Sequence, residues 1–232
     1  MVSKIPTQSR RFLAAAVNAV LFFVLSSLAM LAYPGGTAAD TTRPGYSFLT
    51  NFFSDLGRTR SISNQPNFVS LILFIFAMAC AATSLILFFI TFMTCLTSRR
   101  RTLHLSRFGA LLGIGSAICF VGVAATPWDL VIGPHMIFVL WAFRLFLGAV
   151  VLNLLAVIFT PGLPHRFAWI FATFALLLVG YLILLSAGPD IDTPAGLMIQ
   201  AVGQKLIAYS AVLTVLAQSL IMRQHLLRTH SI

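Results

Sequence analysis

Charged side chains are scarce in this 232-residue sequence, and glutamate is absent from it. Only 9% of the residues are charged and 59% are hydrophobic, whereas soluble domains carry about a quarter charged residues. This balance excludes an ordinary soluble domain. A net charge of +10 would suggest a nucleic-acid partner for a soluble protein. In so apolar a chain we interpret it as a signal of membrane topology, and we expect no nucleic acid to bind.

Cysteine is also rare in the sequence. The three cysteines, Cys80, Cys95 and Cys119, lie within apolar runs or at the end of one. None belongs to a C-x-x-C motif or to a Cys/His pattern with the spacing of a zinc site. The sequence therefore predicts neither a disulfide framework nor a metal site, and no cofactor is expected.

Long apolar runs make up most of the chain instead. A membrane-spanning helix needs roughly 20 apolar residues to cross about 30 Å of hydrocarbon, and proline and glycine end most of these runs. We predict an all-α fold, a polytopic membrane bundle of six transmembrane helices, in one transmembrane domain over residues 1–232. The predicted spans cover Phe12–Tyr33, Asn67–Leu96, Phe108–Ala125, Pro134–Phe159, Phe167–Leu185 and Leu197–Met222.

The basic residues predict the orientation of the bundle, because Lys and Arg in short loops favour the cytoplasmic side. Both termini are predicted to be cytoplasmic, in the plasma membrane of a bacterium or an archaeon. The cytoplasmic side would then hold Lys4, Arg10, Arg11, Arg99, Arg100, Arg101, Arg107, Arg166, Arg223 and Arg228. The outer side would hold Arg43, Arg58 and Arg60 in the first loop, together with every acid of the chain: Asp40, Asp55, Asp129, Asp190 and Asp192.

Two further basic residues, Arg144 and Lys205, lie inside predicted spans. At 1.5 Å per residue, Arg144 lies roughly 15 Å and Lys205 roughly 12 Å below the outer surface. Ionisable groups at this depth normally face the interior of a bundle, where they are paired or functional. One interpretation is structural, with Asp55 or Asp129 neutralising Arg144 or Lys205. The other is an anion site for a lipid headgroup, with Arg144 as a bidentate donor and Lys205 as a point charge.

Other polar residues are predicted to join this outward-facing pocket. The full set of candidate ligand-binding residues is Asn51, Ser54, Asp55, Asp129, His135, Arg144, Gln200, Gln204 and Lys205. Gln200 and Gln204 share a helix face, because they are four residues apart. His135 and Arg144 are nine residues apart and so point roughly 180° away from each other on an ideal helix. Both can face one pocket only if His135 lies in the turn before the helix.

Two other classes of function stay open on the sequence. A membrane-embedded hydrolase or acyltransferase would use Ser54, Asp55 and His135 for nucleophilic catalysis. A small transporter would use the charges inside the membrane as a relay, although no acid lies inside a predicted span. The preferred interpretation is a protein that binds a lipid or senses it, with membrane lipids as partners and a protein partner unknown.

Three short motifs resemble a known family. "NFFSDLG" after the first span, "PWDLVIGPH" before the fourth and "VGQK" in the last are similar to a family of prokaryotic six-helix membrane proteins of unknown function. A fainter similarity links the chain to the eukaryotic membrane family of autophagy modulators and GPI-lipid remodelling helpers. The second likeness implies lipid-related work on the outer side of the membrane. By analogy, the positions of interest are Ser54, Asp55, Asp129, His135, Gln204 and Lys205.

Overall fold

The described part of the chain forms six long helices and is that of a multi-pass integral membrane protein, as predicted. The computed structural model describes residues 5–96 and 99–228, so the predicted position of Lys4 lies outside the described residues. The six helices, all long and apolar enough to cross a membrane, are α1 (Ile5–Ala32), α2 (Phe68–Cys95), α3 (Arg100–Ala125), α4 (Trp128–Ile158), α5 (His165–Ala187) and α6 (Pro194–Arg228).

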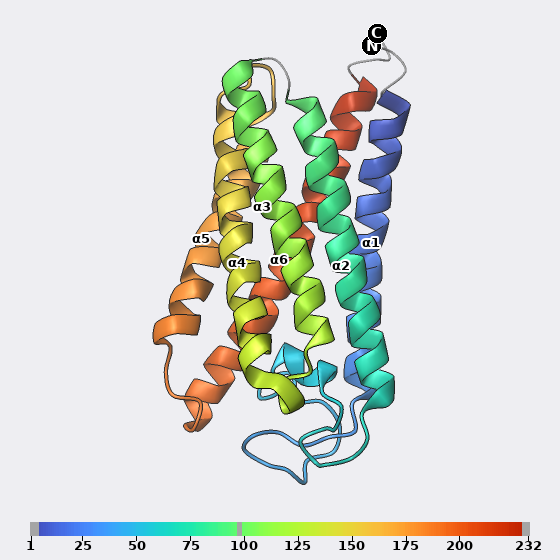
Figure 1. Ribbon diagram of the computed structural model, residues 1–232, viewed down its shortest axis with the longest axis vertical. Helices are drawn as coiled ribbons and strands as arrows, with labels where there is room; N and C mark the ends of the chain where they lie inside the picture. The colour runs from blue at the N-terminus through green and yellow to red at the C-terminus, as the bar shows by residue number, and fades with distance from the viewer. Residues whose placement is uncertain (1–4, 97–98, 229–232) are drawn as a thin grey trace.

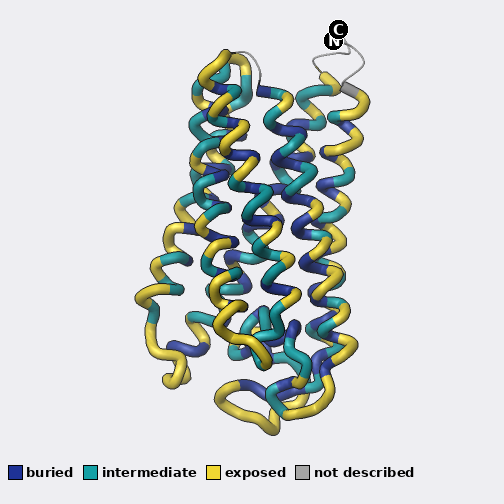
Figure 2. The backbone as a smooth tube through the Cα atoms, viewed as in Figure 1, coloured by how far each residue is buried: buried dark blue, intermediate teal, exposed yellow. Residues whose placement is uncertain are grey.

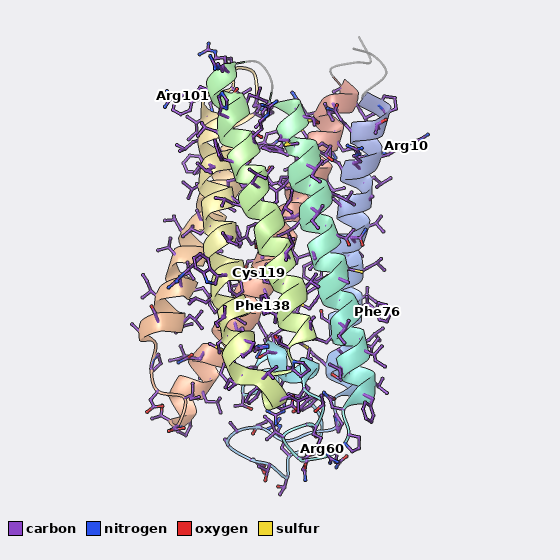
Figure 3. The ribbon with its side chains drawn as sticks, in the orientation of Figure 1. Arg10, Arg60, Phe76, Arg101, Cys119 and Phe138 are labelled. Carbon is purple, nitrogen blue, oxygen red and sulfur yellow. The ribbon has the colours of Figure 1, made fainter. Side chains whose placement is uncertain are left out.

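The helices are arranged as a closed ring. Each one packs against its neighbour in the chain, and α6 returns to pack against α1 (Figure 1). The start of α1 and the end of α6 lie at the same end of the bundle, which we call the terminal end. The opposite end, where the first loop lies, is called the loop end. Arg10 and Arg101 lie near the terminal end, and Arg60 lies at the loop end (Figure 3).

The surface of the ring is apolar where it would contact lipid. Leu31, Trp169 and Leu176 are more than two-thirds exposed, and exposed positions recur along the outward faces of the helices (Figure 2). The interior is filled largely by phenylalanine rings such as Phe88, which packs on Phe92 with centroids 5.2 Å apart. With apolar residues on both faces, these helices are suited to lipid rather than to water.

Helix α4 begins six residues before the predicted start at Pro134. Its first turn runs from Trp128, and Val131 then leaves helical geometry with φ −140° and ψ 65°. Because of this break, Pro134 lies in the first turn of the main segment, where a missing N–H costs no hydrogen bond. The kink therefore accounts for a proline inside the helix.

The first loop, residues 33–67, folds back into the loop end of the ring. Its one helical segment is the 3₁₀-helix η2 (Phe53–Gly57), which contacts α2, α4 and α6 (Figure 1). Phe53, Asp55, Leu56 and Gly57 are buried there. We call η2 the plug, because it occupies the space between the helix ends.

Candidate functional site

Asn51 and Asp55 organise the first loop from within. They are 0% and 1% exposed. Asn51 Oδ1 accepts a hydrogen bond from the Ser47 N–H at 2.8 Å, and Asn51 Nδ2 donates to the Gly36 carbonyl at 2.9 Å and to Asp55 Oδ2 at 3.0 Å. The Phe52 N–H also donates to Asp55 Oδ2, at 2.8 Å. These bonds fix the turn that leads into the plug.

Lys205 joins α6 to this turn. Its side chain is fully buried, and Nζ donates a hydrogen bond to the main-chain carbonyl of Asn51. The rings of Tyr46 and Phe48 lie beside the ammonium group, with their centroids 5.7 Å and 5.2 Å from Nζ. A carbonyl oxygen and two ring faces thus replace part of the water that the cation loses.

Asp55 and Asp129 do not form the ion pairs predicted for them with Lys205 or Arg144, and each carboxylate accepts hydrogen bonds from main-chain N–H groups instead. Asn51 lies between Asp55 and Lys205, because its amide contacts the carboxyl group and its carbonyl contacts the ammonium group. Asp129, at the start of α4, accepts hydrogen bonds from the N–H and hydroxyl groups of Thr59 and from the N–H of Arg60, at 2.7 to 3.1 Å. Asp129 therefore holds the loop and does not neutralise a buried cation.

The plug is attached to three helices. Gln204 Oε1 on α6 accepts a hydrogen bond from the Phe53 N–H at 2.7 Å. The Phe53 ring packs against Phe22, Phe74 and Tyr209, with centroids 5.5 to 5.8 Å apart. These contacts with α1, α2 and α6 set the position of the neighbouring residue, Ser54.

Ser54 opens onto a pocket of about 210 Å³ where the plug meets α4, α5 and α6. Four of the predicted site residues line it: Ser54, His135, Gln200 and Gln204. Two polar residues that the sequence analysis missed, Trp128 and Tyr181, line it as well. The rest of the lining is apolar: Phe52, Ile132, Met136, Val139, Leu184, Leu185 and Ile191. The pocket is thus polar at one side and apolar at its other walls.

The hydrogen bonds of the pocket residues define what they offer a ligand. His135 Nδ1 lies 2.7 Å from the Thr126 carbonyl oxygen, which can only accept, so Nδ1 carries a proton. In the neutral ring, Nε2 is then the acceptor. Gln200 Nε2 donates to the Pro189 carbonyl at 2.7 Å. Its carbonyl oxygen and the Ser54 hydroxyl have no hydrogen bond to another described residue. The pocket therefore offers both donors and acceptors.

A smaller cavity of about 50 Å³ lies behind the plug. It shares Ser54, Val139 and Gln204 with the pocket, and its other walls are apolar, including Phe22 and Phe143. Ser54 and Gln204 therefore stand between a partly polar pocket and an apolar interior.

Arg144 does not belong to the pocket, and the prediction that it faces the interior is wrong. The residue is exposed on α4, and its guanidinium carbon lies 5.9 Å from the ring centroid of Trp141, which is itself 48% exposed. His135 is only 4% exposed. Because nine residues of helix turn by roughly 180°, the inward position of His135 places Arg144 on the opposite, outward face.

The three residues considered for nucleophilic catalysis, Ser54, Asp55 and His135, are not linked to one another by hydrogen bonds. Asp55 accepts hydrogen bonds from Asn51 and Phe52, whereas His135 is held by the Thr126 carbonyl. Asp55 therefore does not orient His135. Ser54 and His135 do line the same pocket, but no hydrogen bond joins them.

The Asp55 carboxyl is an unusual element of this region. Its Oδ1 is buried without a hydrogen-bond partner among the described residues, and so is Nε1 of Trp128, which lies near the same carboxyl. Burial raises the pKa of Asp55 above its usual value, although Asn51 and Arg58 oppose that change. Within the described residues, no three His, Cys, Asp or Glu side chains gather as a group that could hold a metal ion.

No protein-family model, curated protein or solved structure matches this chain.

Proposed function

We propose that this protein is a plasma-membrane protein of a prokaryote that binds the polar head of a lipid in the pocket beside the plug, as a lipid sensor or an accessory protein. The observation that carries the proposal is the convergence of Ser54, His135, Gln200 and Gln204 in one cavity with an apolar rim. Ile132, Met136 and Ile191 on that rim are 44 to 58% exposed, so the pocket opens toward the membrane-facing surface.

The depth of the pocket fits the boundary between headgroups and hydrocarbon. The main segment of α4 after the break at Val131, residues 132–158, has 27 residues and is roughly 40 Å long, whereas the hydrocarbon layer is about 30 Å thick. His135 lies three residues from the start of this segment, which is roughly 5 Å from its end. A lipid head that reached this depth would lie at the edge of the hydrocarbon, where its polar groups meet those of the pocket.

The fainter of the two resemblances noted in the sequence, to the eukaryotic autophagy-modulator and GPI-lipid remodelling family, implies lipid-related work on the outer side. An acyltransferase or hydrolase is the second candidate, favoured by Ser54 and His135 sharing the pocket. Binding is the better supported function, because Asp55 and His135 are held by separate partners.

Photo-cross-linking in vesicles tests the proposal. The protein would be reconstituted in phosphatidylcholine vesicles that contain a lipid with a photoreactive group near its head. Cross-links are expected on peptides that carry Ser54, His135 and Gln200. The double variant Ser54→Ala/Gln200→Leu removes two hydrogen-bonding groups that do not hold the plug. It should reduce these cross-links roughly tenfold or more, because each lost bond costs about 1 kcal/mol.

Arg144→Leu provides the matched control. It removes a polar group from the outward face of α4, the helix that carries His135, and should leave the cross-links unchanged. Equal labelling of the wild type and the double variant, or labels spread evenly around the bundle, would rule out a headgroup site in the pocket.

A further inference from the structure

Two more cavities continue from the pocket along α5 and α6. The first, of about 170 Å³, shares Tyr181 and Leu184 with the pocket. The second, of about 380 Å³, shares Leu177 and Ser210 with the first. We call the two together the α5–α6 groove. Because each cavity shares wall residues with the next, the three lie in a row along α5 and α6, and we call this row the track.

Two glycine residues line the groove, Gly180 on α5 and Gly203 on α6. Gly203 leaves room for the Leu184 side chain, which would overlap an added Cβ there, whereas Gly180 faces open space. A Cβ atom added at Gly180 would meet nothing within 4 Å, so the space beside it is open. Leu177 and Leu206, on the same walls, are more than half exposed. The groove is thus open to the membrane along its side.

The polarity of the track changes along its length. Ser54, His135, Gln200 and Gln204 lie at the pocket end. The groove is lined mainly by apolar residues, with hydroxyl-bearing side chains at Thr173, Tyr181, Ser210 and Thr214. Leu184 and Trp169, at the two ends of the groove, are 15 residues apart on α5, or roughly 22 Å. One leaflet of hydrocarbon is about 15 Å thick. The groove is therefore long enough for one acyl chain of ordinary length.

Charge distinguishes between lipid classes. Among the described residues that line the pocket and the groove, none is Asp, Glu, Lys or Arg. Two nearby cations do not line the pocket: Lys205 binds the Asn51 carbonyl, and Arg58 donates from Nε to the Arg60 carbonyl while its guanidinium stacks over the Trp128 ring, 4.2 Å from the centroid. A phosphate group would lose water here without an ionic partner in the lining itself. Hydroxyl and ester groups, in contrast, match the donors and acceptors present.

We propose that the ligand is an uncharged lipid with hydroxyl or ester groups in its head, and that one of its acyl chains lies in the α5–α6 groove. This inference rests on the proposed function, because it requires the head to occupy the pocket. It adds the chemical class of the ligand and the path of its chain.

The test uses the full-length protein in phosphatidylcholine vesicles with a diacylglycerol that carries a photoreactive group in its acyl chain. Cross-links are expected on α5 and α6 between Leu177 and Leu184 and between Gly203 and Ser210. In Gly180→Leu the new Cβ meets no protein atom within 4 Å, so the side chain extends into the groove. This variant should reduce these cross-links roughly tenfold, because the acyl chain then meets a steric block. Excess unlabelled diacylglycerol should compete, and phosphatidylglycerol should not.

Gly133→Leu is the matched control. Gly133 is exposed on α4, and an added Cβ there also meets nothing within 4 Å, so this substitution adds the same side chain away from the groove. The cross-links of the Gly133→Leu variant should equal those of the wild type. Competition by phosphatidylglycerol as strong as that by diacylglycerol would overturn the lipid class.

The experiments can overturn the proposed chain path in the groove and the proposed headgroup site in the pocket independently. Unchanged labelling in Gly180→Leu, together with loss in Ser54→Ala/Gln200→Leu, would overturn the path of the chain and leave the headgroup site. Unchanged labelling in both variants would overturn the proposed function and this inference together.

Discussion

Lys205 and Asp55 show how two charged groups are accommodated away from water. Both side chains are at most 1% exposed, yet they meet only through Asn51. An isolated buried charge costs several kcal/mol, and even a direct pair can fail to recover that cost. Here the same turn receives a hydrogen bond from the cation and contributes the donors that satisfy Asp55 Oδ2. Both residues therefore serve to dock the plug, and the neighbouring Ser54 faces the pocket as a consequence.

Replacing Asp55 should reveal the cost of its charge. Burial raises the pKa of Asp55 from its usual 3.8, so its contribution to stability is complete below that value and is lost as the pH rises through the raised pKa. Asp55→Asn keeps an oxygen that can accept the hydrogen bonds from Asn51 and Phe52, but it has no proton to lose. When the pH is lowered from mildly alkaline to mildly acidic, the thermal midpoint of the wild type should therefore rise relative to that of the variant.

Midpoints of both proteins in the same detergent, over a pH series, provide the measurement. The charged or titratable groups that interact with this carboxyl are Arg58, Lys205, Tyr33 and Tyr46, and the variant leaves all four in place. Parallel curves for the two proteins would show that Asp55 carries no cost of burial.

The sequence predicted part of the site at this scale. Four of its candidates line the pocket, and helix geometry already indicated that His135 and Arg144 face opposite ways. The sequence alone does not indicate whether His135 or Arg144 points inward, because α4 is apolar on both faces and has no clear polar side. Asn51, Asp55 and Lys205 were expected in the pocket for their polarity. Their hydrogen bonds depend on the fold of a loop that no periodic pattern describes.

At the scale of the helices, close packing depends on small residues in α3. An added Cβ at Gly109 would overlap the Asn153 amide of α4, and one at Gly113 would overlap the Phe89 ring of α2. The G-x-x-x-G spacing thus lets α3 approach two neighbours, as such motifs commonly do between membrane helices. Phe89 cannot easily move away, because it packs against Phe88 and Phe146 with centroids 5.2 and 6.1 Å away.

Gly113→Ala should therefore destabilise the bundle by about 1–3 kcal/mol, the usual cost of overfilling a packed core. Gly180→Ala is the matched control, because the same methyl group enters open space there. That change should be neutral or stabilising, since alanine favours a helix more than glycine does. Thermal midpoints in detergent would distinguish them, and equal midpoints for the two variants would contradict tight packing at Gly113.

The existence of the six helices could be predicted from the sequence, because a span of roughly 20 apolar residues is a strong signal. The start of α4 could not, since Pro134 suggested a first residue and the break at Val131 leaves no mark in composition. The plug was also missed as an element. At five residues it is too short for a periodic pattern, and its burial depends on contacts with Gln204 and Phe74 that come from distant parts of the chain.

For the whole molecule, charge is divided between the two ends of the ring. Arg10, Arg99, Arg166 and Arg223 belong to the terminal end, whereas the acids belong to the loop end with the plug and the pocket. The two ends therefore differ in both charge and structure. If the terminal end is cytoplasmic, the pocket opens at the outer leaflet, and the proposed lipid reaches it from there.

Cysteine labelling tests this orientation. In a variant without Cys80, Cys95 and Cys119, a single cysteine at Gln65 would mark the loop end and one at His165 the terminal end, since both positions are exposed. A maleimide that cannot cross membranes should label Gln65→Cys in intact cells and His165→Cys only after permeabilisation, because the arginine-rich end is retained in the cytoplasm. Detergent-solubilised protein, in which both cysteines should react, controls for accessibility. The reverse pattern in intact cells would place the pocket at the cytoplasmic leaflet and remove the outer lipids from its reach.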